Sequence, residues 1–278
     1  MPQQPQGQNH AMNNNPNQAK ANNSNPKSNN HHQQHALAGT SIKGREFEDP
    51  ATKAEMKAMA ARALWHLCEG NAPICHIITE SKALLCFAVL LEKGHDDVQF
   101  NSAMALMEIT AVAEQNSDLR RSAFKPTSPA ARAVVEQLLK IIEKADSDLL
   151  IPCIKSVGNL ARTFRATETR IIGPLVRLLD EREPEVSKEA AIALIKFAST
   201  ENYLHLNHSK AIIQAAGIKH LIQLVYFGEQ MVQFPALILL CYVAMHVPDS
   251  EDPEIETLIN EAKSRLELYQ ASSSRGHP

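Results

Sequence analysis

The feature that most constrains the fold of this chain is an apolar cluster that recurs four times with fixed internal spacing. The clusters share the form L-x-x-L-L and begin at Phe87, Leu138, Leu175 and Leu221. A further aliphatic residue follows 19 positions after the start of each cluster, at Leu106, Val157, Leu194 and Leu240. Small residues stand at offsets 15 and 23 in every copy, whereas the copies themselves begin 51, 37 and 46 residues apart. This is typical of stacked supersecondary units joined by segments of variable length.

Within each unit the apolar residues recur three and four positions apart, which indicates helices. Gly94 and Gly228 are expected to end helices, and Pro152, Pro184 and Pro235 are expected near helix starts. Each unit should therefore hold a short helix, a middle helix and a longer third helix. A repeat of about 40–47 residues is typical of HEAT and armadillo units. The expected fold class is all-α, a right-handed α-solenoid of armadillo repeats.

The chain divides into three segments by composition. Residues 1–48 are rich in Asn, Gln, Pro and His, so they bury too little apolar surface to offset the entropy of ordering and are expected to be disordered. Residues 49–247 should form one partial and four full armadillo repeats. The partial repeat is a third helix, with Leu64 and Cys68 in core positions and no first two helices, so we expect this chain to be the C-terminal part of a longer solenoid unless another element covers that end. Residues 248–278 should form a C-terminal capping helix and tail.

Composition excludes several classes of protein. The formal net charge is −3, so the basic field of a general nucleic-acid-binding protein is missing. The five cysteines are an odd number spread through apolar segments, which favours a reducing compartment over a disulfide framework. The sequence shows no apolar run of membrane-spanning length and no signal-peptide pattern. A cytoplasmic location follows as an expectation.

The sequence predicts neither an enzyme nor a cofactor. It contains no nucleophile elbow, no Walker loop, no dinucleotide fingerprint and no zinc-protease motif. His66, Cys68, Cys75 and His76 are zinc-ligand types without the paired spacing that zinc sites use. His205 and His208 are expected in a polar loop, and no metal site is expected there.

The third helices should line the concave side of an armadillo stack. The side chains 17, 21 and 24 positions after the start of each apolar cluster should point outward there. The candidate groove residues are Arg62, His66, Met104, Glu108, Lys155, Asn159, Arg162, Ile192, Lys196 and Tyr242. Nuclear-import armadillo proteins, which resemble this chain at the level of the fold, carry a ladder of Trp and Asn that holds basic peptides. Here only Asn159 stands at a ladder position and Trp65 is out of register, so basic localisation signals are not expected. The groove cations Lys155, Arg162 and Lys196 instead predict an acidic or mixed-charge partner segment.

The longest segment between units runs from Gln115 to Arg132 and is a candidate regulatory loop. It places the bases Arg120, Arg121 and Lys125 near Ser128. A phosphate on Ser128 would add negative charge beside these bases and could order the loop. Contact of the bases with anionic lipid, or a simple mobile connection, are the alternatives.

Long strings of the sequence resemble the plant Armadillo Repeat Only family. They include EDPATKAEMKAMAARALWHLCEGN, VQFNSAMALMEITAVAE and SDLLIPCIKSVGNLARTFRATETRIIGPLVRLLDEREPEV, and the likeness spans almost everything from about Glu48 to Tyr269. The resemblance implies a non-enzymatic scaffold of polarised cell growth, tied to regulators of Rho-of-plants GTPases and to the actin cytoskeleton. It also implies a peripheral location at the plasma membrane of growing cell tips, with the nucleus left open.

Two other functions remain as alternatives. Many plant armadillo proteins follow a U-box, so this chain could be an adaptor or substrate-binding fragment of a ubiquitin-ligase-type armadillo protein. A nuclear-import receptor is the third interpretation, and it predicts tight binding of a basic peptide. The identity of the partner and the oligomeric state are left open.

Overall fold

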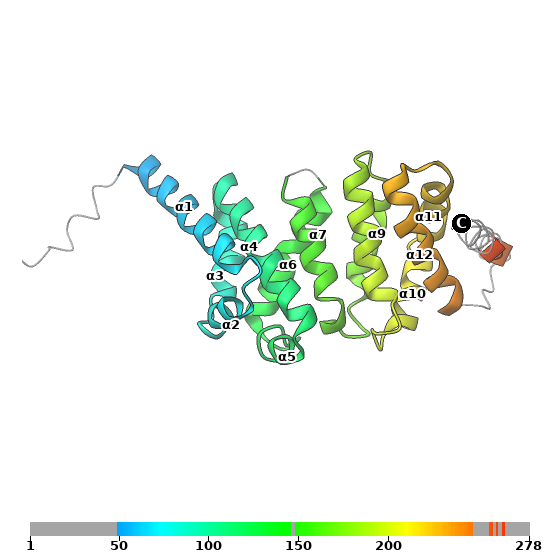
Figure 1. Cartoon of the computed structure of the whole chain (residues 1–278), viewed down its shortest axis with the longest axis horizontal. Helices are drawn as coiled ribbons and strands as arrows, with labels where there is room; N and C mark the ends of the chain where they lie inside the picture. The colour runs from blue at the N-terminus through cyan, green and yellow to red at the C-terminus, as the bar shows by residue number, and fades with distance from the viewer. Residues whose placement is uncertain (1–48, 146–147, 247–255, 258–259, 261–262, 265–278) are drawn as a thin grey trace, which may run out of the picture. The chain divides into compact units, whose positions relative to one another are not determined.

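The computed structural model describes residues 49–145, 148–246, 256, 257, 260, 263 and 264 (Figure 1). These residues form helices and connections, with no strand among them. The α-helices are α1 (Pro50–Cys68), α2 (Ala72–Glu80), α3 (Leu84–Lys93), α4 (Asp96–Gln115), α5 (Ser117–Ala123), α6 (Pro129–Lys144), α7 (Leu150–Asn159), α8 (Ile172–Arg177), α9 (Pro184–Ala198), α10 (His205–Gln214), α11 (Gly217–Phe227) and α12 (Gln230–His246). Three 3₁₀ turns in this part of the chain are η2 (Ala161–Thr163), η3 (Thr169–Ile171) and η4 (Leu178–Asp180).

The helices group into successive units that confirm the expected all-helical solenoid. Helix α1 is followed by the units α2–α4, α5–α7, η3–α9 and α10–α12. The last helices of the units, together with α1, lie in a row in which α1 contacts α4, α4 contacts α7, α7 contacts α9, and α9 contacts α12 (Figure 1). Because each unit packs mainly on its neighbours, the apolar registers of the sequence can merge into one continuous core.

The predicted core spine is confirmed. Leu106, Val157 and Leu194 are 0% exposed and Leu240 is 1% exposed. The residues at offset 15 are all 0% exposed. They are small because a larger side chain at this position would hold neighbouring helices apart. Fully burying an aliphatic side chain contributes about 1.5–3 kcal/mol, so the repeated registers supply much of the driving force for stacking.

Two details of the predicted unit are wrong. In the second unit the middle helix α6 has 16 residues and the third helix α7 only 10, the reverse of the expected order. Helix α7 ends at Asn159, and the chain continues as the 3₁₀ turn η2. Pro235 lies inside α12 rather than near its start, where it removes one backbone donor from the helix.

The expected polar loop at His205 and His208 is also a helix, α10. Ala211 and Ile212 are buried on this helix and anchor it to the core, which the polar composition of the segment concealed. His208 is 0% exposed, and its Nδ1 lies 3.1 Å from the carbonyl oxygen of Phe197. Burial lowers the pKa of His208, which favours the neutral ring that can donate this hydrogen bond.

The segment Gln115 to Arg132 is mostly helical, so its description as a loop is wrong. It contains α5 and the start of α6, and only residues 124–128 connect them. The Oδ1 atom of Asn116 accepts hydrogen bonds from the backbone nitrogens of Asp118 and Leu119, both at 3.0 Å, and so caps α5. Leu119 and Phe124 are 1% and 2% exposed and fix the segment to the core.

Most of the predicted C-terminal capping helix and the whole N-terminal segment lie outside the described residues. Within the described part, no single helix meets the length and apolarity needed to cross a membrane, and α2 and α3 meet them only as a pair bent by 87°.

Candidate protein-binding groove

Helices α4, α7 and α9 enclose a hollow of about 350 Å³, which we call the groove. Five of the predicted groove residues line it together: Glu108, Lys155, Asn159, Ile192 and Lys196. An adjoining hollow of about 130 Å³ adds Arg162. The fixed offsets of the sequence therefore bring residues of three successive units to one surface.

The groove depends on a close approach of α7 and α9 at Gly158. A Cβ atom added at Gly158 would lie 3.0 Å from both the Cα and the Cβ of Ala193. Only glycine allows the two helices to pack at this distance. Their closeness places the groove side chains of α7 within hydrogen-bonding reach of those on α9.

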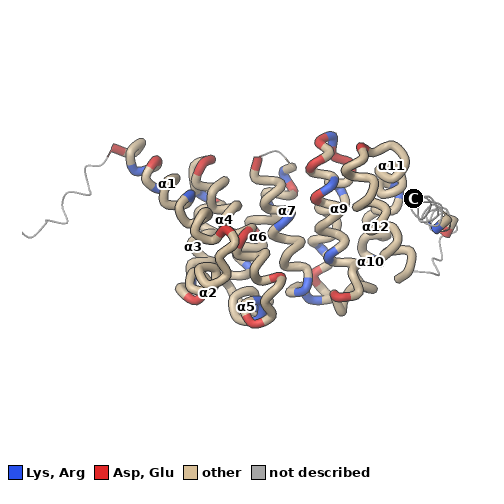
Figure 2. The backbone as a smooth tube through the Cα atoms, viewed as in Figure 1, with Lys and Arg blue, Asp and Glu red and all other residues tan. Residues whose placement is uncertain are grey.

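The cations of the groove are paired with acids rather than free. Lys196 Nζ lies 2.7 Å from Glu114 Oε2 and donates to Asn159 Oδ1 at 2.6 Å. Lys155 Nζ lies 3.6 Å from an oxygen of Glu189, which is 7% exposed. Figure 2 shows acidic and basic positions interleaved on these helices instead of a single basic patch.

The prediction that Asn159 points outward is wrong, because this side chain is only 6% exposed. Its Nδ2 donates to Thr110 Oγ1 at 3.2 Å on α4, while its Oδ1 accepts from Lys196 on α9. The amide therefore joins the third helices of three units. It cannot hold a peptide backbone unless these bonds are exchanged.

Arg162 is likewise held by the protein. Its Nη2 donates to the carbonyl oxygen of Glu114 at 2.6 Å, and its Nη1 lies 3.6 Å from Glu201 Oε2. The carbonyl belongs to the last turn of α4, where helix carbonyl groups lack partners within the helix. Arg162 thus satisfies a helix end of a unit other than its own.

The groove carries a balanced set of charges. Glu108, Glu114 and Glu189 face Lys155, Lys196 and Arg162 across the two adjoining hollows. Among the described residues, none makes a hydrogen bond or an ion pair with the carboxylate of Glu108. This balance favours the mixed-charge partner over a purely acidic one.

The remaining predicted groove residues lie apart from this hollow. Arg62 lines a separate space of about 420 Å³ at α1 and α4, together with Trp65 and Phe100. His66 stacks on Trp65 with ring centroids 4.5 Å apart, and its Nδ1 lies 3.4 Å from Glu69. Met104 is half-buried on α4.

Tyr242 lies on α12, with its ring 6.0 Å from that of His246. It stands at the same offset as Glu108, Asn159 and Lys196, in a later unit than any of them.

Of the predicted regulatory bases, Arg120 already binds backbone carbonyl groups. Its Nη1 donates to the carbonyl oxygens of Ala113 and Glu114 at 2.9 and 2.8 Å, which caps the C-terminus of α4. Burial and the nearby Arg162 lower the pKa of Arg120. Arg121 and Lys125 are exposed.

Ser128 is the N-cap of α6, and its hydroxyl oxygen accepts from the backbone nitrogen of Ala131 at 3.4 Å. Phosphorylation of Ser128 and contact of this segment with anionic lipid stay predictions.

No group of three or more His, Cys, Asp or Glu side chains suited to a metal ion occurs in the described part of the chain. Cys68 and Cys75 are both 0% exposed, and the Cys75 thiol donates to the Cys68 carbonyl oxygen at 3.5 Å. Burial raises the pKa of the Cys153 thiol, which keeps it protonated as a small core residue.

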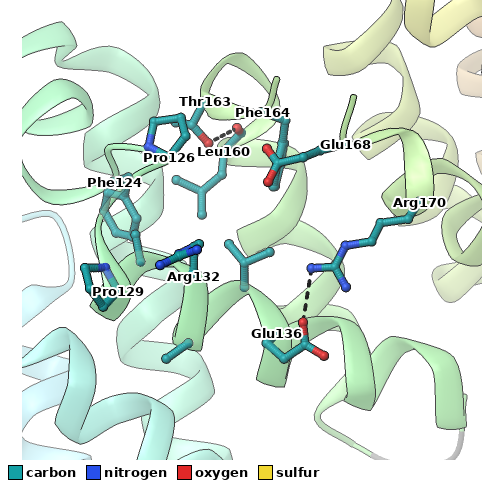
Figure 3. Close-up of a pocket in the computed structure, with 13 residues that line it drawn as sticks. Phe124, Pro126, Pro129, Arg132, Glu136, Leu160, Thr163, Phe164, Glu168 and Arg170 are labelled. Atoms are coloured by element: carbon teal, nitrogen blue, oxygen red, sulfur yellow. Dashed lines mark hydrogen bonds and ion pairs between the residues drawn. The ribbon is translucent and has the colours of Figure 1, made fainter. Parts of the chain in front are cut away.

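A further hollow, of about 480 Å³, was not predicted from the sequence. Residues of the α5–α6 connection, of α6 and of the segment after α7 line it (Figure 3). The one sequence signal that could have indicated it is the short spacing of 37 residues between the second and third units.

Comparison with known proteins gives relatives at the level of the fold. No protein-family model matches the chain. A designed armadillo repeat protein in complex with the peptide (KR)4 superposes with a TM-score of 0.59 and 19% identity, covering 82% of this chain and 94% of that one. A second designed armadillo repeat protein gives a TM-score of 0.55 with 18% identity, covering 74% and 91%. An engineered protein that is 24% identical superposes with a TM-score of 0.57, covering 79% of this chain and 93% of that one.

Among curated proteins, Vacuolar protein 8 of Candida albicans is 32% identical over 97 residues, which are 35% of this chain and 15% of that protein. The match therefore spans a small part of that relative. The structural likenesses show that the described units have the armadillo-repeat fold, as the spacing of the apolar clusters predicted.

Proposed function

We propose that this chain is a non-enzymatic scaffold that binds a protein segment along the groove formed by α4, α7 and α9. The observation that carries the proposal is the hollow shared by these three helices, which combines both signs of charge with apolar side chains such as Met107 and Ile192. Solenoid repeats present extended concave surfaces that suit a peptide better than a small substrate. The designed armadillo protein with a bound peptide supports this use of the fold.

The bound segment should carry both an acid and a base. Glu108 is a groove acid whose carboxylate has no partner in the described part of the chain, so a cationic side chain of the segment would pair with it. Lys155 is 39% exposed at its side chain and lies 3.6 Å from Glu189, so a carboxylate of the segment could share this cation. Charge pairs of this kind contribute mainly to specificity and to the rate of association.

The finer proposal is that the partner is a regulator of Rho-of-plants GTPases, in polarised tip growth and actin organisation. It is supported by the resemblance of the long sequence strings to the Armadillo Repeat Only family. The same resemblance supports a cytoplasmic location, peripheral at the plasma membrane of growing tips.

Isothermal titration calorimetry of the purified chain with a purified regulator of Rho-of-plants GTPases tests both the use of the groove and the identity of the partner. We expect binding that Glu108→Lys and Lys155→Glu each weaken by about tenfold, because each reversal sets like charges against the segment. Glu92→Lys on α3 and Lys140→Glu on α6 are matched controls, since both positions are exposed and lie outside the groove. Binding that neither groove variant changes would remove the groove from the proposal, and absence of binding would remove this partner.

A further inference from the structure

The third unit lacks a first α-helix in the described part of the chain. Helices α2, α5 and α10 take this position in the other units, whereas residues 160–171 form only the turns η2 and η3. The spacing of 37 residues before the third cluster is the shortest of the three spacings, so the missing length corresponds to the missing helix.

The place of the missing helix can be inferred from the next unit. There, α10 packs against α8 and α9 of the preceding unit. One unit earlier, the equivalent supports are α6 and α7. The hollow of about 480 Å³ lies against α6 and the end of α7, and thus stands where a helix is found one unit later.

The hollow has apolar residues in its lining, among them Phe124, Pro126, Val135, Leu160 and Phe164 (Figure 3). Phe124, Leu160 and Phe164 are already buried, whereas Pro126 and Val135 are half-buried and remain partly open to a ligand. The volume of the hollow falls within the ~300–1,000 Å³ typical of sites that enclose a ligand. A helix in this place would cover Pro126 and Val135 with its own apolar side chains, just as α10 buries its Ala211 and Ile212 one unit later.

Some charged side chains at the rim of the hollow have a partner within the protein, and others have none. Arg170 Nη2 lies 3.1 Å from Glu136 Oε2, and Glu168 Oε2 accepts from the backbone nitrogen of Arg165 at 3.0 Å. Arg132 is exposed, and its guanidinium makes neither a hydrogen bond nor an ion pair with any described residue. Figure 3 shows Arg132 on the side of Phe124 and Pro129, with the Arg170–Glu136 pair opposite. The rim therefore leaves both signs of charge to a ligand, because the Arg132 guanidinium and the Glu168 carboxylate each lack an ion-pair partner among the described residues.

We propose that this hollow is a second protein-docking site, which receives an amphipathic helical segment of a partner protein. The segment inserts bulky apolar side chains where the first helix of the third unit is missing, and it places a carboxylate against Arg132. Helices that lay an apolar face in a groove are a recurring mode of peptide recognition. The site is distinct from the groove, because Leu160 and Thr163 line the hollow while Asn159 and Arg162 line the groove.

The test is a selection of random peptides displayed on phage against the full chain, followed by fluorescence anisotropy with synthetic copies of the enriched peptides. We expect the enriched sequences to share bulky apolar residues three or four positions apart and an Asp or Glu within one helical turn. Arg132→Glu should weaken their binding by about tenfold. Ala133→Leu, which fills part of the hollow from α6, should weaken it as well.

Arg182→Glu is the matched control, since this arginine is exposed, lies outside the hollow and should leave binding unchanged. Thermal melts of each variant verify that the fold is retained. Enriched peptides that bind Arg132→Glu as tightly as the native chain, or that lose affinity with Glu108→Lys in the groove instead, would overturn the proposal. So would a selection without enrichment, or binding of 3-phenylpropionate at the hollow in the absence of any peptide ligand.

Discussion

At the scale of single residues, the position of a groove side chain follows from its place in the repeat, but its hydrogen-bond and ion-pair partners come from neighbouring units. Asn159, Lys196 and Glu108 share one offset in successive repeats, yet only the side chain of Glu108 is without a partner in the described part of the chain. Lys196 and Glu114 are 82 residues apart in the sequence and meet at 2.7 Å. The register therefore predicts which surface a residue joins, and contacts between units decide whether it remains available.

Ser128 gives a prediction at this scale. Because its hydroxyl caps α6, Ser128→Ala should lower the free energy of unfolding by about 1 kcal/mol, and Ser128→Asp should preserve it, since a carboxylate also accepts from the first turn. Urea denaturation followed by circular dichroism measures both. The neighbouring exposed Thr127→Ala should have little effect, and an equal loss in Thr127→Ala and Ser128→Ala would contradict the capping role.

At the scale of elements, the lengths of the helices vary more than the repeat pattern suggested. The connection between the first and second units became α5 because Asn116 caps a segment that Leu119 anchors in the core. The third unit had no length for such a helix, and η2 and η3 take its place. Helix α5 lies in a segment where the spacing between copies changes, whereas η2 begins at Ala161, the offset-23 position of the second unit.

The contact of α7 with α9 gives a second prediction. Gly158→Ala should destabilise the fold by about 1–3 kcal/mol, because its Cβ would come within 3.0 Å of the Ala193 backbone and force the helices apart. Gly173→Ala on α8 is the matched control: the added Cβ would meet only the end of Arg177 at 3.9 Å, so a neutral or slightly stabilising effect is expected. Chemical denaturation of both variants tests this, and equal effects at the two glycines would disprove the close approach.

At the scale of the whole molecule, a destabilising mutation should affect its own unit and the adjacent units most, and distant units least. Leu194→Ala removes a fully buried spine residue of α9 and should cost about 2–5 kcal/mol. Because units stabilise mainly their neighbours, hydrogen exchange should accelerate most in α9, α7 and α12, and least in α1 and α2.

Hydrogen-exchange mass spectrometry resolves these helices. Leu206→Ala on α10 serves as the control, since this leucine is 47% exposed and its loss should stay local. A uniform acceleration over all helices in Leu194→Ala would show instead that the row opens as one cooperative unit.

The sequence by itself determined the solenoid. Hydrophobic periodicity is a local property of each repeat, so the same offsets carry apolar residues in every unit, and these residues are buried in the core. It also predicted part of the groove surface, since Glu108, Lys155, Asn159, Ile192 and Lys196 line one hollow, whereas other predicted groove residues such as Arg62 and Tyr242 lie apart from it. Only the tertiary structure decided that the groove cations are paired, that Asn159 joins three helices, and that a hollow stands beside Arg132. These depend on side chains from different units meeting, and the distance between two units follows from packing at positions such as Gly158 rather than from spacing along the chain.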